Sequence, residues 1–318
     1  MSKIGIVITT YNYQINYMPW YLENLFKSLS SQMHDYRIDV LIVDNLSGDN
    51  FLSMLGGKCL EYSDDKIAFA YVTEKDYHYH FSSMNFGFYI LNHQDHYDYF
   101  CFSVDDTAFV EQCGLSLAIE EFVDPNVGIV SCQCDYDNAP PELSQYDDSS
   151  NNNSMVVRIG ECVNGQFMIF SREYMKAYEF QYPDILKSFG TESLLTYCCA
   201  AIDKYWVLCK KAQLNNAKKV ESLRKYKQKG TDGYMTYSGI TLEDLFQKGY
   251  SVGMGFQGFF KRKSRFSHNP RKNLYFQPHD PSLYDEGGKA KRRDDLFLYI
   301  KNNLFTHNSF EERYSKIR

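Results

Sequence analysis

The sequence predicts an α/β fold in which helices flank a mixed, mostly parallel β-sheet. Short runs of apolar, often β-branched residues alternate with longer segments of helical periodicity, and several of the short runs end in polar residues. Such alternation favours parallel strands joined by right-handed crossovers. The chain has 318 residues, enough for one large domain with an extension.

The first two thirds of the chain supply the expected elements. Four short, continuously apolar segments are typical of buried strands: residues 3–9, 39–43, 67–72 and 99–104. Two segments place their apolar side chains on one helical face: residues 17–30 and 81–92. The same patterns predict helices over 115–122 and 193–202, a strand over 126–132, and ordered segments at 156–159 and 165–171.

Two stretches depart from this alternation. Residues 137–154 contain two prolines and then Asp, Ser and Asn in series, so we expect a long loop or lid there. Residues 208–229 are Lys-rich and amphipathic, a short helix is expected at 241–249, and after Lys261 the chain is basic and irregular until a last helix at 294–304. We therefore expect a main domain over residues 1–210 and a helical, basic extension over 211–318.

Composition excludes several classes of protein. The net charge of -6 provides no global basic field for binding nucleic acid. The apolar runs are too short to span a membrane, and the first residues lack the zones of a secretory signal, which predicts a cytoplasmic protein. The nine cysteines form no CxxC pair, so we expect reduced core residues and neither a zinc ribbon nor a redox pair.

Polar residues follow three of the predicted strands at the point where each strand ends. Asp44 follows one strand, Asp105 and Asp106 follow another, and a Thr-Thr-Tyr-Asn run follows the first. In open α/β sheets this edge binds ligands. Adjacent carboxylates after a buried strand need a cation or hydrogen-bond donors, so we expect a divalent metal there. The alternatives are a helix cap for Asp105 or Asp106 and an Asx-turn for Asp44.

Four segments in order, IGIVITTYN, VLIVDNLSGDN, SSMNFGF and FCFSVDDTAF, resemble family 2 glycosyltransferases of the GT-A fold, over residues 3–205. The resemblance implies transfer of a sugar from a nucleotide-diphosphate donor to a sugar or glycan, with inversion and with Mn²⁺ or Mg²⁺ as cofactor. A UDP-sugar is the expected donor, and a glycan or glycolipid is the expected acceptor. The extension is expected to complete the acceptor side.

The resemblance also implies which residues contact the donor. These positions carry the family's motifs in this sequence: Thr9, Tyr11 and Asn12 in the loop that touches the nucleotide, Asp44 at the base, and Asn85 with Gly87 beside the nucleotide-sugar.

The expected metal motif departs from the family's pattern. Ser103-Val104-Asp105-Asp106 falls where the family has its DxD motif, so Ser103 stands in place of the first acid. Asp105 and Asp106 are the implied metal ligands, with weaker metal affinity and an altered ribose contact at Ser103. A late histidine often completes such sites, and His268 is the candidate, with His279 and His307 as alternatives. Histidines in basic loops are also typical of solvated residues.

The segment GTESLL falls where the family has an acidic pair ahead of a helix, and Thr191 replaces the first acid. Glu192 is therefore the implied catalytic base, which removes a proton from the acceptor hydroxyl. The alternative is a helix-start residue that interacts favourably with the dipole. In that case the base would be sought among three other acids: Asp135, Asp137 and Glu161.

Two further sequence features stay open. His78 and His80 have metal-like spacing without additional ligands, and we interpret them as nucleotide or acceptor contacts or as residues without a role. The basic residues between 261 and 272 suit phosphates, a solvated face or an anionic membrane surface.

Two alternative functions are weighed against the transferase. A sugar nucleotidyltransferase would need a Gly-rich phosphate loop after the first strand, and ITTYNYQINYMPW contains no glycine. A catalytically degenerate nucleotide- or glycan-binding module would be consistent with Ser103 and Thr191. Hydrolysis of the donor in the presence of Mn²⁺ would separate that module from an enzyme.

Overall fold

The computed structural model of the chain describes the larger part of residues 2–216 and a few segments near the end. The described residues are 2–10, 18–75, 80–105, 107–134, 154–157, 166–184, 192–216, 297–298, 300–302, 305 and 310–316. None of the helices in these ranges has the length and apolar character needed to cross a membrane.

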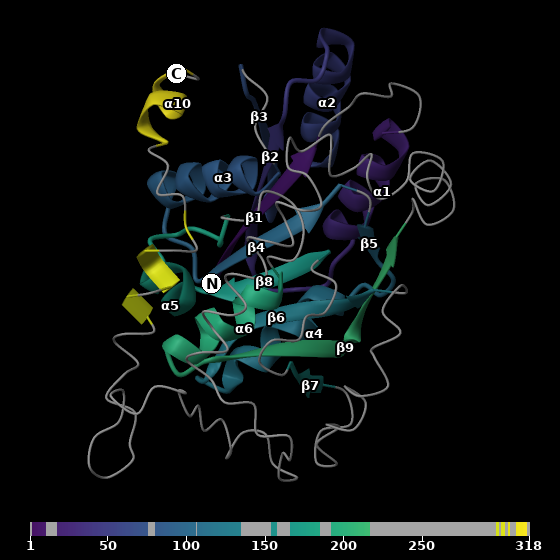
Figure 1. Cartoon of the computed structure of the whole chain (residues 1–318). Coiled ribbons are helices and arrows are strands. Elements are labelled where there is room, and N and C mark those ends of the chain that lie inside the picture. Colours follow the sequence, from purple (N-terminus) through teal and green to yellow (C-terminus); the bar gives the residue numbers. More distant parts are fainter. Residues whose placement is uncertain are drawn as a thin grey trace, which may run out of the picture.

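A mixed sheet of nine strands forms the centre of the described part (Figure 1). Its strand order is β3-β2-β1-β4-β8-β6-β9-β5, and β7 pairs with β9. β1 (Lys3–Thr10) is hydrogen-bonded in parallel to β2 (Arg37–Asp44) on one side and to β4 (Tyr99–Val104) on the other. β3 (Ile67–Thr73) continues the parallel arrangement beside β2. The predicted mixed, mostly parallel sheet is confirmed.

The other half of the sheet contains the antiparallel pairs. β8 (Phe167–Ser171) runs antiparallel to both β4 and β6 (Val127–Cys134), so β6 has the same direction as β4. β9 (Tyr205–Asn216) is parallel to β6. Two short strands, β5 (Thr107–Phe109) and β7 (Ser154–Val156), run antiparallel to β9.

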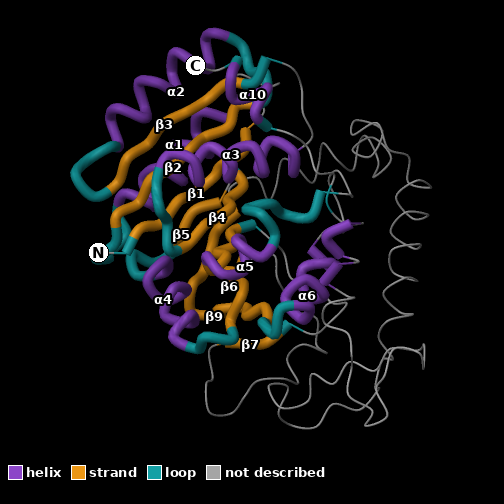
Figure 2. The backbone as a smooth tube through the Cα atoms, turned by 90° about the vertical axis from the view of Figure 1, so that its left-hand side faces the viewer, coloured by secondary structure: helices purple, strands orange, loops and turns teal. Residues whose placement is uncertain are grey.

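One face of the sheet is covered by α1 (Met18–Ser30), α2 (Asp49–Tyr62) and α4 (Gly114–Glu120), with the short 3-10 helix η1 (Glu121–Val123) after α4 (Figure 2). Apolar side chains of these three α-helices form one buried cluster with alternate residues of β1, namely Ile4, Ile6 and Ile8.

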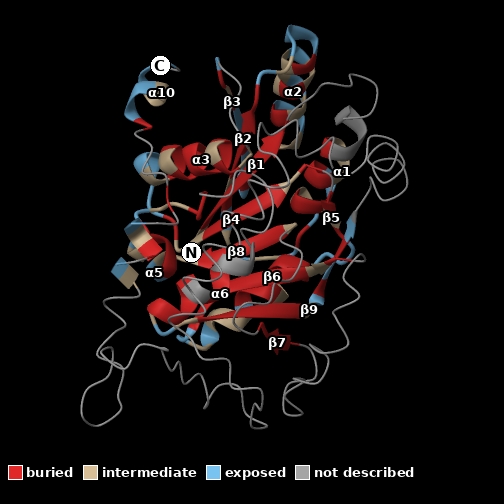
Figure 3. Ribbon diagram, in the orientation of Figure 1, coloured by how far each residue is buried: buried red, intermediate tan, exposed pale blue. Residues whose placement is uncertain are grey.

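The opposite face is covered by α3 (His80–Gln94), α5 (Arg172–Ala177) and α6 (Glu192–Ala201). A second cluster on this side contains Val7 of β1 and extends to Phe310, which precedes α10 (Glu311–Ser315). Both faces of β1 are therefore buried, as Figure 3 shows for the central strands, and this explains the continuous apolar run in the sequence.

Three features differ from the sequence-based expectation. The predicted pattern did not include α2, and β5 follows the Asp105 turn where a helix had been the alternative. β9 continues to Asn216, so the sheet extends past the expected boundary at residue 210. The expected loop at 137–154, apart from Ser154, and the expected helix at 241–249 lie outside the described residues.

Gly87 allows α3 to pack closely against the sheet. A Cβ added at this position would lie 2.5 Å from Cγ1 of Val7 and 3.0 Å from Cγ2 of Val43, far inside normal contact distances. Real side chains do not tolerate such overlap, so the helix would have to move away from β1 and β2.

Gly87→Ala should therefore lower the free energy of unfolding by about 1–3 kcal/mol through overpacking, although alanine is the better helix former. Gly57→Ala is the matched control, because an added Cβ on this exposed position of α2 meets nothing within 4 Å. It should stabilise the protein by up to about 1 kcal/mol. Denaturant titration measures the free energy of unfolding of both variants. If Gly87→Ala stabilised the protein as much as Gly57→Ala, the close packing of α3 on the sheet would be contradicted.

Candidate functional site

The carboxyl ends of β1, β2 and β4 form one edge of the sheet, called the carboxyl edge below. The strands are in register there, with Thr10 opposite Asp44 and Thr9 opposite Val104. The predicted polar residues therefore lie together, as expected for a ligand-binding edge.

A buried hydrogen bond joins the ends of β1 and β4. The Thr10 hydroxyl donates to Oδ2 of Asp105 at 2.9 Å, and Asp105 is almost completely buried. The next element is β5, and α4 begins later, with Cys113 at its N-cap position. The alternative role of Asp105 as a helix cap is therefore wrong, and its carboxylate is held at the carboxyl edge.

Asp44 is fully buried at the end of β2, and its two carboxylate oxygens differ. Oδ2 accepts a hydrogen bond from the N–H of Ser47, three residues on, at 3.0 Å, so this oxygen is engaged within the turn after β2. Oδ1 has no hydrogen-bond partner. Burial raises the pKa of Asp44 above its usual value, and the bonds from Ser47 only partly oppose that rise. A buried acceptor without a donor costs free energy, which a donating ligand would recover.

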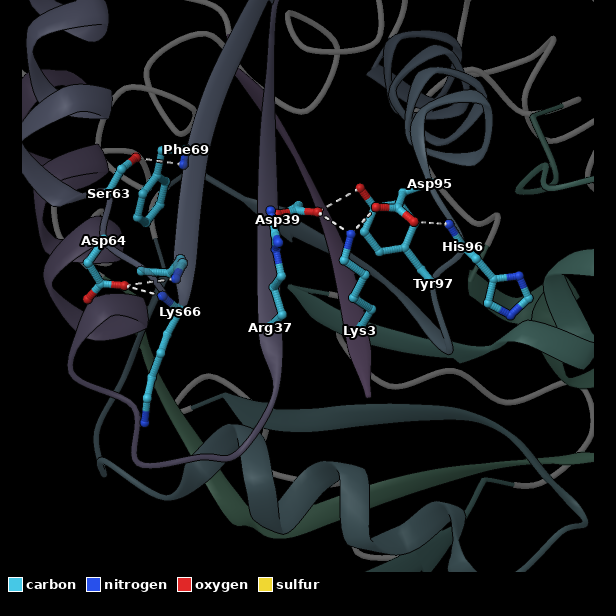
Figure 4. Close-up of polar contacts among 11 residues, drawn as sticks. Lys3, Arg37, Asp39, Ser63, Asp64, Lys66, Phe69, Asp95, His96 and Tyr97 are labelled. Atoms are coloured by element: carbon cyan, nitrogen blue, oxygen red, sulfur yellow. Dashed lines mark hydrogen bonds and ion pairs between the residues drawn. The ribbon is translucent and has the colours of Figure 1, made fainter. Parts of the chain in front are cut away.

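At the opposite edge of the sheet, partly buried and exposed carboxylates are paired with cations or hydrogen-bond donors. Figure 4 shows Lys3 between Asp39 and Asp95, forming ion pairs with both. The hydroxyl of Tyr97 donates to Asp39 at 3.0 Å, and Arg37 approaches the same carboxylate. The unpaired oxygen of Asp44 stands out against this edge, where each carboxylate has a cation or donor.

Ser103 is the second-last residue of β4 and is engaged by neighbouring residues. It is fully buried, and its hydroxyl donates to the main-chain oxygen of Val104 at 2.9 Å. The same hydroxyl lies 3.1 Å from Oγ1 of Thr107. The Ser103 hydroxyl is therefore engaged within the protein, and its expected contact with the donor stays a prediction.

Asn85 and Gly87 shape the site from within the core. Both are buried, and the Asn85 amide exchanges two hydrogen bonds with the main chain of Tyr182, at 2.9 and 2.7 Å. Gly87 packs against Val7 and Val43. Both residues therefore contribute to the packing beside the carboxyl edge, and their expected contact with the nucleotide-sugar stays a prediction.

His80 joins the site although the sequence left its role open. Its Nδ1 lies 2.9 Å from the Thr9 hydroxyl, and its ring packs edge-on against Phe102, with centroids 5.2 Å apart. His80 is the first residue of α3 and is only partly buried. These contacts hold the imidazole beside the ends of β1 and β4.

Glu192 is the first residue of α6, a helix of ten residues that leads into β9. α6 ends shortly before β9, which runs parallel to β6, β4 and β1. The end of α6 therefore lies close to the start of β9, at the edge opposite the carboxyl edge. α6 also belongs to the sheet face that carries α3.

The described residues supply only part of the ligand set that a divalent cation would need. Asp105 supplies a carboxylate at the carboxyl edge, whereas the described residues contain no group of three or more His, Cys, Asp or Glu side chains that could hold a metal. Mg²⁺ and similar ions are often held by one or two carboxylates, with phosphates and water completing the shell. Four other expected site residues lie outside the described ranges: Tyr11, Asn12, Asp106 and His268.

Sequence reasoning missed two residues of this edge. Thr10 was seen only as part of a polar run, yet it positions Asp105. Glu74 follows β3 directly and is 4% exposed, and its N–H donates to the main-chain oxygen of Asp44. The signal that identified Asp44, an acid directly after a buried strand, could also have identified Glu74.

The buried carboxylate of Asp44 generates a prediction about stability. Because burial raises its pKa, the folded state binds a proton more tightly than the unfolded state, so stability falls as pH rises through that pKa. Asp44→Asn removes the buried charge and keeps an acceptor for Ser47. It should raise the Tm of the ligand-free protein at pH 7, by about 2–4 °C for each kcal/mol gained.

Thermal melts at several pH values measure this effect. The gain should shrink as the pH approaches the acidic range in which Asp44 itself becomes protonated. A lower Tm of the Asn variant at pH 7 would show that the carboxylate is not a stability cost.

Comparison with known proteins identifies the family to which the chain belongs. The family model described as Glycosyl transferase family 2 matches residues 5–205, which include every described residue of the carboxyl edge. No curated protein matches the sequence significantly.

Several solved structures have a similar fold. A mannosyltransferase from Pyrobaculum calidifontis, solved with GDP-Man and Mn²⁺, is 16% identical with a TM-score of 0.53, covering 78% of this chain and 68% of its own. TarS residues 1–349 from S. aureus is 15% identical with a TM-score of 0.50, covering 80% and 79%. GalNAc-T7, solved with UDP, GalNAc and Mn²⁺, is 8% identical with a TM-score of 0.53, covering 67% and 43%. At these identities the likeness shows a shared fold.

Proposed function

The chain belongs to glycosyl transferase family 2 and is a glycosyltransferase of the GT-A fold, and we propose that its donor is a UDP-sugar whose base is bound by Asp44. The observation that carries this proposal is the buried, unpartnered Oδ1 of Asp44 at the carboxyl edge. A nucleotide base that donates one N–H to this oxygen would satisfy the acceptor.

The chemistry of the bases favours uracil. Oδ2 of Asp44 is already engaged by Ser47, so the side chain offers one free acceptor. Uracil presents a single imide N–H between two carbonyl groups, which matches one acceptor. Guanine presents two neighbouring donors and suits a carboxylate with both oxygens available. Adenine and cytosine present a ring nitrogen lone pair that a carboxylate would repel. Thr9, Tyr11 and Asn12 are proposed to contact the rest of the nucleotide.

We propose Mn²⁺ or Mg²⁺ as the cofactor, held by Asp105 together with Asp106 and His268. The hydrogen bond from Thr10 keeps the Asp105 carboxylate at the carboxyl edge, where the donor diphosphate would lie. A bound cation would neutralise the charge that develops on the leaving diphosphate. The inward orientation of Ser103 is the reason to expect modest metal affinity.

Transfer is proposed to proceed with inversion, and Glu192 is proposed as the base. Its carboxylate would take the proton of the acceptor hydroxyl as that oxygen forms a bond to C1 of the sugar. The bond between C1 and the phosphate oxygen breaks on the opposite face, and UDP leaves with its electron pair. The start of a helix favours a negative charge, which suits a carboxylate in this role.

The acceptor is proposed to be a glycan or glycolipid, in polysaccharide biosynthesis in the cytoplasm. In this proposal residues 1–210 contain the catalytic centre and residues 211–318 complete the acceptor side. The basic residues between 261 and 272 would suit the surface of a membrane that holds a glycolipid acceptor.

One observation favours a second function, a nucleotide-binding module without transfer activity. The first acid of the metal motif is replaced by Ser103, whose hydroxyl is used inside the protein. Such a module would bind UDP and would neither transfer the sugar nor hydrolyse the donor.

Asp105→Asn tests the metal site. In the wild type, Mn²⁺ should tighten UDP binding. In the variant, the affinity for UDP in the presence of Mn²⁺ should be at least about tenfold lower, because an amide is a poor substitute for a carboxylate ligand. Ser103→Ala is the control and should keep the full Mn²⁺ effect, since its hydroxyl is engaged by Val104 and Thr107. Calorimetric titration with and without Mn²⁺ measures both. An undiminished Mn²⁺ effect in Asp105→Asn would refute the assignment.

Glu192→Gln tests the base and the enzyme together. Loss of a positioned base should lower kcat by about 10²–10⁴-fold, whereas UDP affinity should change little, because the proposed role concerns the acceptor. Glu173→Gln is the control, since Glu173 also lies in the first turn of a helix, α5, which follows β8 at the opposite edge. Unchanged kcat in Glu192→Gln would redirect the search to Asp135, Asp137 and Glu161.

A further inference from the structure

A buried ion pair lies next to Asp44, the residue proposed to bind the nucleotide base, and has no part in the mechanism above. Glu74, directly after β3, forms an ion pair with Arg313 of α10, and both side chains are largely buried. The other carboxylate oxygen of Glu74 accepts a hydrogen bond from the Ser83 hydroxyl at 2.6 Å. The main-chain N–H of Glu74 donates to the main-chain oxygen of Asp44 at 2.9 Å.

Arg313 connects two elements that the sequence separates. Besides Glu74 at the end of β3, its guanidinium donates to Oγ of Ser82, in the first turn of α3, at 3.0 Å. The guanidinium also lies 4.4 Å from the ring centroid of Phe86 and 5.2 Å from that of Phe310. Burial lowers the pKa of Arg313 to about 10, so it remains charged at neutral pH and the ion pair persists.

These contacts join the residues on either side of the connection between β3 and α3. Glu74 precedes the connection, and Ser82 follows it. His80, which is hydrogen-bonded to Thr9, belongs to the same short stretch. One guanidinium therefore joins the end of β3, which borders Asp44, to the start of α3, where His80 contacts Thr9.

The ion pair is not needed to attach α10 to the protein. Phe310 packs against Phe86 and Tyr89, with ring centroids 6.1 and 5.8 Å apart. Tyr314 packs edge-on against Tyr89 at 5.8 Å. A buried ion pair typically contributes little net stability relative to apolar residues of the same size, because both charges lose their hydration. Its value lies in the geometry that it imposes.

We propose that Arg313 is a positioning residue of the donor site, which bridges Glu74 and Ser82 so that the end of β3 and the start of α3 keep the positions in which Asp44 and Thr9 meet the nucleotide. The inference rests on the proposed function, since the ligand is the nucleotide of the donor. Arg313 acts through Glu74, Asp44 and His80 and does not itself contact the donor.

The test compares two substitutions of Arg313. Arg313→Met keeps an unbranched side chain between Phe86 and Phe310 but removes the bridge. It should weaken UDP binding and raise the donor KM by about tenfold, within the range typical of couplings through packed contacts, with kcat nearly unchanged. Arg313→Lys keeps the charge but not the fork of donors, and it should recover part of the affinity.

Two further variants separate positioning from loss of stability. Arg313→Met leaves Glu74 buried without its cation, so the double variant Glu74→Gln/Arg313→Met should recover Tm while UDP binding stays weak. Lys301→Met is the matched control, because the Lys301–Glu179 pair also ties a late segment to the domain, away from the carboxyl edge. It should leave UDP affinity unchanged.

The outcomes distinguish this inference from the proposed function. A wild type that binds UDP, with Arg313→Met and the double variant both weakened, supports the positioning role. Unchanged affinity in Arg313→Met, or affinity that returns together with Tm in the double variant, would overturn it alone. A wild type that binds no UDP with Mn²⁺ present would overturn the proposed function first.

Discussion

The position of β1 between two parallel partners determines where every described site residue lies. Its hydrogen bonds to β2 and β4 bring the three carboxyl ends level, so that Thr10 lies opposite Asp44 and Thr9 opposite Val104. Alternate residues of β1 belong to separate buried clusters on the two faces. A shift of one residue would exchange those faces, so packing fixes the register and the register assembles the carboxyl edge.

Carboxylates are paired at the amino edge of the sheet, whereas one carboxylate oxygen at the carboxyl edge has no partner among the described residues. This difference indicates where a ligand binds. At the amino edge, Lys3 neutralises Asp39 and Asp95. At the carboxyl edge, Asp44 is buried with one oxygen unpartnered, and the polar side chains around it are held by neighbours such as Thr10 and Arg313. A protein keeps an unfavourable buried acceptor where a ligand recovers the cost, which is the arrangement expected of a preorganised binding site.

The sequence predicted the parts of this structure that depend on local pattern. The parallel strands were evident because each is continuously apolar, and the ligand edge was evident because acids directly follow those strands. α2 was missed, since Gly56 and Gly57 interrupt its helical pattern. The roles of Ser103 and Asn85 could not be predicted, because they depend on which partners the fold supplies: Thr107 for the first, and Tyr182, distant in sequence, for the second. The pairing of Glu74 with Arg313 is also a product of tertiary structure.

The central claim is that Asp44 selects a uracil nucleotide through its single unpartnered oxygen. Calorimetric titration of the wild-type protein with UDP and with GDP, under identical Mn²⁺ concentrations, tests it most directly. UDP should bind more tightly by about 10–100-fold, which corresponds to a hydrogen bond to a charged group. Equal affinity for the two nucleotides, or tighter binding of GDP, would contradict the account.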